Sequence, residues 1–395
     1  MRPVAAGGRR PLTSNAIPAA TSPAVTSEAR TRSDSTQCPR KALVEQTTAA
    51  RYRWIDLVRG TAVVLVIVLH SQYGISIRYD GLWSWLPLMS EYLAPFRMPV
   101  LMFLSGLMVA RSLQKGPRRF FTGKLKNIAH PYVVWTLVAF VLYSLRWVLM
   151  NEPMPDELFP LLILPYNYLW FLYCLFIYYV LAFFLFKLSA KGAVAVTLVG
   201  YLLYFYLAQH LAPDWLLVPD DDGRMVPTLP TKIVFYAVFF MLGGWLGENL
   251  SGFADGLARL NPFVVWLLVA VCLAGYLMPL HPFSPVYLLI SLASLVPLAR
   301  LAMLGWVQRC TTLLQWCGRQ SIVLFVAHMP IILVVVTVLS KAMPDSNANL
   351  VFGLLFGVTF LCCCVLARMS QRWAAVRFLF AYNLKGRQVR VGSRA

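Results

Sequence analysis

The chain has 395 residues, of which 59% are hydrophobic and only 13% are charged. Soluble globular proteins average about 45–50% apolar and about 25% charged residues, so this composition excludes a soluble enzyme and a secreted disulfide scaffold. Long apolar runs also exclude an outer-membrane barrel, whose strands alternate apolar and polar residues over short segments. The net charge of +19 would by itself suit nucleic-acid binding, but its distribution along the chain indicates membrane topology instead.

Residues 1–50 are rich in Ala, Thr, Ser, Pro and Arg and contain no apolar stretch. Such a composition buries too little surface to order itself, so we expect a disordered N-terminal tail. The segment lacks the hydrophobic region of a signal peptide, so the first span is expected to act as the membrane anchor.

Ten apolar runs come after this tail, nine of them about 17–22 residues long, the length that crosses a hydrocarbon core at about 1.5 Å per residue. The sixth is shorter. The sequence therefore predicts an all-α integral membrane protein, a bundle of about ten transmembrane helices. The predicted membrane domain occupies residues 51–367, and residues 368–395 form a basic C-terminal tail. The predicted spans are 55–76, 92–110, 131–150, 168–186, 193–211, 233–247, 262–280, 285–304, 321–340 and 350–367.

The Lys and Arg residues gather on one side of this arrangement. All but six of the 35 fall in the tails and alternate loops that share a side with the N-terminus. The exceptions are Arg78, Arg97, Arg146, Arg224, Lys232 and Lys341. Cytoplasmic loops are enriched in Lys and Arg, so both termini are predicted to be cytoplasmic, in the inner (plasma) membrane. The basic side would also attract anionic membrane lipid, and no nucleic-acid partner is expected.

The first span carries three polar residues on one helical face, namely Asp56, Arg59 and His70. At about 100° per residue they fall within roughly 60° of one another, and Arg59 and His70 are about 16 Å apart along the axis. Ionisable residues inside spans are expensive and therefore candidate functional residues. The alternatives are an interfacial ion pair for Asp56 and Arg59, and a hydrogen-bonded core histidine for His70.

The second span contains Arg97 about as far below the outer end as His70, so the two are expected to share a depth. Arg97 could stabilise an oxyanion there; alternatively it pairs with Glu91 or extends to the outer surface. Ser105, followed by Gly106, is a further candidate, although close helix packing explains that pair as well.

Between the second and third spans the sequence predicts a basic cytoplasmic loop. Its cations Arg118, Arg119, Lys124 and Lys126 suit a multiply phosphorylated ligand, or serve only the topology. Trp170 at the start of the fourth span and His328 within the ninth are additional candidates; His328 could instead accompany a kink at Pro330. The eight cysteines form no CxxC pair or Cys/His cluster, so no metal site is predicted.

Several segments together resemble the membrane-bound acyltransferase family 3, which includes O-acetylases and fucose 4-O-acetylase-like proteins. The opening segment is Trp54–Gly60 with His70 eleven residues after Arg59. The other matching segments, in order, are Met98–Gly106, the basic segment ending in Pro131–Trp135, Leu169–Leu172, a weaker match at Phe239–Gly244, and Gly318–Ser321 with His328 and Pro330.

The resemblance implies that His70 and Arg59 are essential and that the co-substrate is an acyl-CoA. Lys124 and Asn127 occupy the positions of an Arg-x-x-Arg pair that many members carry, with Lys126 adjacent. The expected reaction moves an acyl group, expected to be acetyl, from cytosolic acyl-CoA to a hydroxyl of an envelope or exported carbohydrate or glycolipid.

The hypothesis places the CoA phosphates on Lys124, Lys126, Arg118 and Arg119. His70 acts as general base or carries the acyl group transiently. Two other functions remain open from the residues alone: a transporter of an anionic or lipid-linked solute without covalent chemistry, and an inactive family member that acts as a scaffold. No inverted repeat supports the transporter.

Overall fold

The computed structural model describes residues 39–150, 168–219, 225–276 and 281–382. The chain divides into two units, Met1–Thr48 and Ala49–Ala395. In the first unit only residues 39–48 are described, and they are helical. The second unit contains every candidate membrane span.

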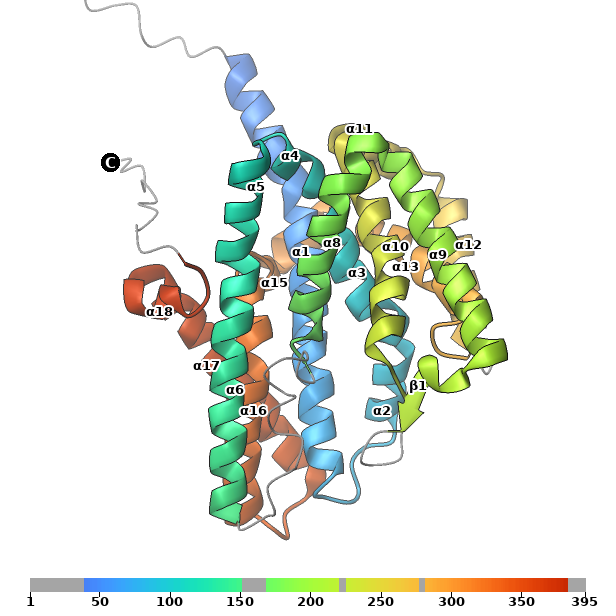
Figure 1. Ribbon diagram of the computed structural model, residues 1–395. Helices are drawn as coiled ribbons and strands as arrows, with labels where there is room; N and C mark the ends of the chain where they lie inside the picture. Colours follow the sequence, from blue (N-terminus) through green and yellow to red (C-terminus); the bar gives the residue numbers. More distant parts are fainter. Residues whose placement is uncertain (1–38, 151–167, 220–224, 277–280, 383–395) are drawn as a thin grey trace, which may run out of the picture. The chain divides into compact units, whose positions relative to one another are not determined.

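The second unit is a bundle of helices with one small hairpin (Figure 1). The first half comprises α1 (Pro39–Ser76) from residue 49 onward, α2 (Trp85–Tyr92), α3 (Ala94–Gly106), α4 (Val109–Leu113), α5 (Pro117–Lys124), the π-helical turn η1 (Leu125–Ala129), α6 (His130–Met150), α8 (Trp170–Leu188) and α9 (Ala190–Leu211). The second half comprises the 3-10 turn η2 (Pro213–Trp215), β1 (Leu217–Pro219), β2 (Met225–Pro227), α10 (Leu229–Glu248), α11 (Leu250–Arg259), α12 (Pro262–Tyr276), α13 (Pro285–Met303), α14 (Gly305–Cys310), α15 (Thr312–Arg319), α16 (Ser321–Ala342), α17 (Ala348–Arg372) and α18 (Ala374–Phe378). β1 and β2 pair antiparallel.

Nine helical segments within the described residues are long and apolar enough to cross a membrane. α11 and α12, bent by 91° at their junction, make a tenth if they are one span. The chain is therefore a multi-pass membrane protein with the predicted all-α fold. The outward faces of the candidate spans carry exposed apolar side chains such as Val141 and Leu188, as expected of surfaces that face lipid rather than water.

The start of the seventh predicted span, residue 262, coincides with the start of a helix in the structure. α12 begins at Pro262, and a residue that precedes proline is disfavoured in the helical region. α11 accordingly ends before Asn261, whose side-chain oxygen accepts a hydrogen bond from the Phe263 amide at 2.9 Å. The last predicted residues of this span, 277–280, lie outside the described part of the chain.

The basic segment between the second and third spans is a helix, which corrects the predicted loop. Gly116 has a φ of 80°, a left-handed value that favours glycine. Pro117 then starts α5, as proline often does at the first helical position, and α5 continues through η1 into α6. Residues 117–146 thus form one candidate span, and the cations lie on a helix of fixed geometry.

The C-terminal end of the described chain folds back onto α6. α17 extends to Arg372, so the predicted domain boundary at residue 367 falls within a helix. After α18, the Trp135 indole donates a hydrogen bond to the Leu379 carbonyl at 3.0 Å, and His130 Nε2 lies 2.6 Å from the Phe378 carbonyl oxygen. The residues just beyond α17 are therefore attached to the bundle at the start of α6.

Helices α3 and α10 are packed backbone against backbone. A Cβ atom on Gly106 would collide with the Phe240 carbonyl oxygen, and one on Gly243 with the Phe103 carbonyl oxygen. Small residues that allow such an approach are typical of helix pairs in membranes. α13 packs against α3, and α9 against α10.

On the other side of the bundle, α16 packs against both α6 and α17. α1 connects the two groups, because it contacts α3 through Arg59 and α16 through Gly74 and Ile332. Its central position in the view of Figure 1 agrees with these contacts. Side chains on α1 consequently face both the helices around α3 and the helices around α16.

Candidate functional site

The first polar contact along α1 joins it to α15. Gly60 faces the Leu314 carbonyl oxygen and Gly318 faces the Asp56 carbonyl oxygen, each so closely that a Cβ atom would clash. This approach brings the Arg319 guanidinium to 3.7 Å from the Asp56 carboxylate. The pair is half-exposed on the arginine side. The predicted alternative paired Asp56 with Arg59; among the described residues the ion-pair partner of Asp56 is Arg319 instead.

Arg59 lies one turn further along α1 and turns toward α3 and α8. Its Nη2 donates to the Leu104 carbonyl oxygen at 3.4 Å, and its charge lies within electrostatic range of the Tyr179 hydroxyl. Tyr179 donates in turn to the Ser105 carbonyl oxygen at 3.1 Å. The Lys124 ammonium sits 3.5 Å from the centre of the Tyr179 ring. Arg59, Lys124 and Tyr179, which we call the basic cluster, therefore meet at one end of the bundle.

The other predicted phosphate ligands are not brought into the basic cluster. Arg118, Arg119 and Lys126 are exposed on the helical segment, whereas Lys124 is half-buried. The exposed Lys115 is the cation within electrostatic range of Lys124. Asn127 donates to the Gly123 carbonyl at 2.7 Å. A helix disperses these side chains around its axis, which the predicted loop could not anticipate.

His70 and His328 lie side by side on α1 and α16. Their ring centroids are 5.2 Å apart, and Tyr168 meets His328 edge-on at 5.6 Å. His328 is fully buried, and its Nδ1 lies 2.6 Å from the Phe325 carbonyl oxygen. Because a carbonyl oxygen only accepts hydrogen bonds, Nδ1 must carry the proton. In the neutral ring Nε2 is then a bare acceptor, and no hydrogen-bond partner for it exists among the described residues.

Arg97 is buried, with 6% of its surface exposed. His70 lies within electrostatic range of both Arg97 and His328. The tyrosine hydroxyls within electrostatic range of the Arg97 charge are those of Tyr73, Tyr236 and Tyr287. The two predicted alternatives for Arg97 were a pair with Glu91 and extension to the outer surface. Within the described chain the structure shows neither, since the guanidinium is buried and Glu91 forms no ion pair with it.

The remaining candidates, Ser105 and Trp170, have the following contacts. The Ser105 hydroxyl donates to the Leu101 carbonyl of its own helix at 2.7 Å. Trp170 stacks on Tyr236 with 5.1 Å between ring centroids. Its ring also lies beneath the Lys232 ammonium, 5.3 Å away.

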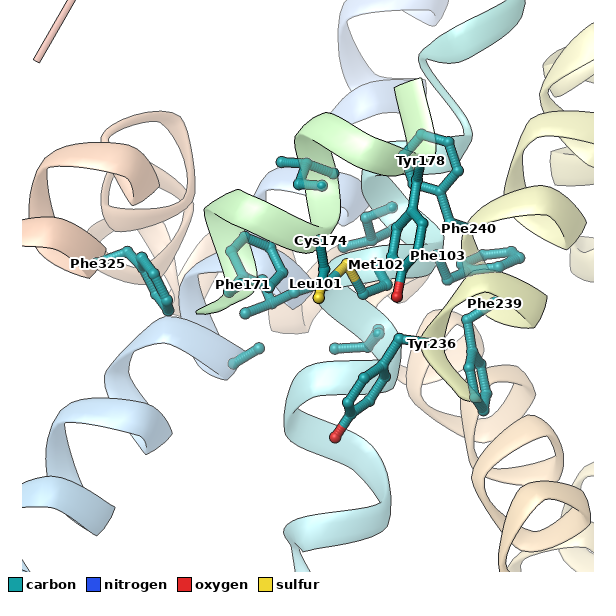
Figure 2. Close-up of a cluster of buried hydrophobic side chains, with 14 of the residues drawn as sticks. Leu101, Met102, Phe103, Phe171, Cys174, Tyr178, Tyr236, Phe239, Phe240 and Phe325 are labelled. Atoms are coloured by element: carbon teal, nitrogen blue, oxygen red, sulfur yellow. The ribbon is translucent and has the colours of Figure 1, made fainter. Parts of the chain in front are cut away.

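An apolar cluster packs between helices α3, α8 and α10. Figure 2 shows aromatic and aliphatic side chains of these helices packed together, among them Met102, Phe103 and Phe240. Tyr236 lies at the edge of the cluster with its hydroxyl directed away from Phe103 and Phe240. The basic cluster and the histidine pair are connected by α1, along which Arg59 and His70 are about 16 Å apart.

Sequence reasoning missed Tyr168, Tyr179 and Lys232 as members of the site. Lys232 carried a usable signal, because an ionisable residue at the start of an apolar span is a candidate functional residue. The tyrosines had none, since aromatic residues are common throughout these spans. Only their position against Arg59, Lys124 and His328 distinguishes them.

Comparison with known proteins identifies the family of the chain. The family profile described as "Acyltransferase domain" matches residues 52–368, which is nearly the whole membrane bundle. The chain belongs to the acyltransferase 3 family. It is also similar to the inner membrane protein YcfT of Escherichia coli (strain K12), with 23% identity over 306 residues, 70% of this chain and 78% of that protein. No solved structure matches the chain significantly.

Family membership confirms the resemblance seen in the segments around Arg59, His70 and His328. The structure adds a physical reason for two of them. The Trp54–Gly60 and Gly318–Ser321 segments are in contact through Gly60 and Gly318, so in this acyltransferase 3 protein each glycine permits the approach of the other helix.

Proposed function

We propose that the protein is an O-acyltransferase that moves an acyl group, in the first instance acetyl, from cytosolic acyl-CoA to a hydroxyl of an envelope or exported carbohydrate or glycolipid. The observation that carries the proposal is the arrangement on α1. One face of this helix presents Arg59 to the basic cluster and His70 to a second buried histidine. Membership of the acyltransferase 3 family supports the reaction class.

The two ends of this face suit the two ends of an acyl-CoA. Lys124 and Arg59 provide positive charge for the CoA phosphates, which prefer clustered cations. The distance of about 16 Å from Arg59 to His70 suits an extended pantetheine arm. The excess of Lys and Arg on this side supports a cytoplasmic location for the donor and for both termini. The inner-membrane relative supports the inner membrane as the location.

His70 acts as the general base in the proposed step. It removes the proton from the acceptor hydroxyl while the oxygen attacks the thioester carbonyl. Arg97 stabilises the negative charge that develops on the carbonyl oxygen. The attack forms the new C–O bond of a tetrahedral intermediate. Its collapse re-forms the carbonyl, breaks the C–S bond to leave the ester, and returns the proton from His70 to the departing CoA thiolate.

Transfer of radiolabelled acetyl from acetyl-CoA in inverted membrane vesicles tests the proposal. Wild type is expected to label a glycan or glycolipid, and His70→Ala to abolish the label at matched expression. His281→Ala is the matched control, because His281 is exposed, its Nδ1 lies 2.9 Å from the Pro282 carbonyl oxygen, and its ring meets Phe205 edge-on at 6.3 Å, away from the candidate site residues. Uptake of a solute without any covalent label in wild type would contradict the acyltransferase and favour a transporter.

A further inference from the structure

Two cations, Arg97 and Lys232, lie in the first turns of α3 and α10. Each is the fourth residue of its helix, since α3 begins at Ala94 and α10 at Leu229. The reaction proposed above gives Arg97 a role at the thioester, but it gives Lys232 none. Ionisable groups at membrane depth are costly, and their presence calls for a functional account.

The packing of α3 on α10 places these two cations near the same end of the helix pair. Gly243 faces the carbonyl of Phe103, and Gly247 that of Leu107. Residue numbers therefore rise together along the two helices, which run in the same direction. The same register sets Arg97 level with Ala237, so Lys232 lies roughly 7.5 Å nearer the helix start.

Two aromatic side chains connect the cations. The Lys232 ammonium lies 5.3 Å from the Trp170 ring centroid, and the Trp170 ring stacks on Tyr236 at 5.1 Å. Tyr236 is in turn within electrostatic range of Arg97. We call Arg97, Lys232, Trp170 and Tyr236 the anion site.

The positive charge of this site has no counter-charge in the described chain. No carboxylate among the described residues forms an ion pair with Arg97 or Lys232, and neither side-chain cation forms a hydrogen bond with a described residue. The start of α10 adds to the imbalance, because a helix dipole is positive at its N-terminus and disfavours a cation there. A cation–π contact with Trp170 attracts Lys232 but does not neutralise it. The site therefore has the electrostatics of an anion receptor.

We propose that Lys232 of the anion site binds a carboxylate or phosphate group of the acyl acceptor, while Arg97 stays at the thioester carbonyl, so that the acceptor is an anionic glycan or glycolipid. This proposal rests on the proposed acyl transfer and names its substrate class. The Trp170 face offers a platform for the sugar ring beside the charged group. Because Arg97 is within electrostatic range of His70, an acceptor held here by its anionic group presents a neighbouring hydroxyl to the base.

Direct binding to the purified full-length protein is the first test. The probes are glucuronate, glucose 1-phosphate and neutral glucose, measured by titration calorimetry in detergent. Wild type is expected to bind both anionic sugars at least about tenfold more tightly than glucose, with affinity falling as salt rises. Lys232→Gln should remove that preference, and Lys341→Gln, which changes an exposed lysine elsewhere on the same predicted side, should keep it. Equal binding of all three sugars by wild type would overturn the proposal.

Acetyl transfer then separates failure of this site from failure of the reaction. In a wild type that transfers acetyl, Lys232→Gln should raise the KM for anionic acceptors about tenfold and leave neutral acceptors unchanged. Trp170→Leu should weaken both acceptor classes. If Lys232→Gln changes neither class, the anion site is wrong while acyl transfer stands. If no protein transfers any acyl group, the proposed function itself fails.

The acyl group itself is the other possible source of an anion here. Comparing acetyl-CoA with succinyl-CoA on a neutral acceptor distinguishes it, because only succinyl carries a carboxylate. Under the proposal, Lys232→Gln changes transfer from acetyl-CoA and transfer from succinyl-CoA by the same factor. A selective loss of succinyl transfer would overturn the acceptor assignment and give the site to the acyl group. Size-exclusion profiles that match wild type confirm that each variant is folded.

Discussion

The imidazole rings of His70 and His328 lie 5.2 Å apart, on helices separated by some 250 residues of sequence. The Phe325 carbonyl fixes the proton of His328 on Nδ1, and Nε2 remains a buried acceptor without a partner in the described chain. A buried acceptor left unpaired costs free energy. The natural donors for it are a ring N–H of His70 or the hydroxyl of a bound acceptor.

His328 is accordingly expected to position the base or the acceptor. His328→Ala should lower kcat for acyl transfer about 10–100-fold, less than His70→Ala, because the base remains but its orientation is lost. His328→Gln, which retains a hydrogen-bonding group, should recover part of the rate. Measurement of kcat and KM with matched-expression vesicles checks this. Wild-type kcat in His328→Ala would show that the ring is only packing.

Lys124 is expected to contribute more to donor binding than its exposed neighbours. Its ammonium lies over Tyr179 beside Arg59, whereas Lys126 is exposed. Lys124→Gln should raise the KM for acetyl-CoA about tenfold, since a charge-assisted phosphate contact is lost. Lys126→Gln is the matched control and should change it less than about twofold. An equal effect of both would mean that the helix acts only as a diffuse positive surface.

Gly60 and Gly318 are expected to be intolerant of even one added methyl group. Each faces a backbone carbonyl of the opposite helix, and backbone cannot move aside as a flexible side chain can. Gly60→Ala or Gly318→Ala should destabilise the protein by about 1–3 kcal/mol, measured by thermal unfolding in detergent.

Gly353→Ala and Gly357→Ala provide the control, because a Cβ atom on either of these α17 glycines meets nothing within 4 Å. Replacing glycine by alanine inside a helix normally stabilises it by a few tenths to about 1 kcal/mol. Unfolding temperatures that fall equally in all four variants would contradict the close contact between α1 and α15.

Asp56 and Arg59 are expected to differ sharply although they are one turn apart. The Asp56–Arg319 pair is partly exposed at 3.7 Å, and such pairs contribute about 0–1 kcal/mol. Asp56→Asn should thus leave acyl transfer within about twofold of wild type at matched protein level. Arg59→Gln should reduce it strongly, because Arg59 lies in the basic cluster. Transfer assays on both variants, normalised to folded protein, measure this difference. An inactive Asp56→Asn would contradict the prediction and give Asp56 a functional role.

Much of the fold could be predicted because a membrane constrains a chain strongly. A span must be apolar over a fixed length, so runs such as 321–340 and 350–367 coincide with α16 and α17 within a few residues. Prediction is weakest where length and apolarity are not decisive. The basic segment that starts at Pro117 is predicted to be a loop because of its charge, whereas the structure has the helix α5 there.

By itself the sequence determined the class of protein, the approximate spans and the presence of Arg59 and His70 on one helical face, because these depend on composition and on the period of a single helix. Only the tertiary structure decided which residues meet them. His328 lies beside His70, Lys124 approaches Arg59 through Tyr179, and Lys232 lies over Trp170, which stacks on Tyr236. These contacts depend on how α1, α3, α10 and α16 pack against one another. That packing is set by side-chain shapes and glycine positions far apart in the sequence, so no local sequence pattern predicts it.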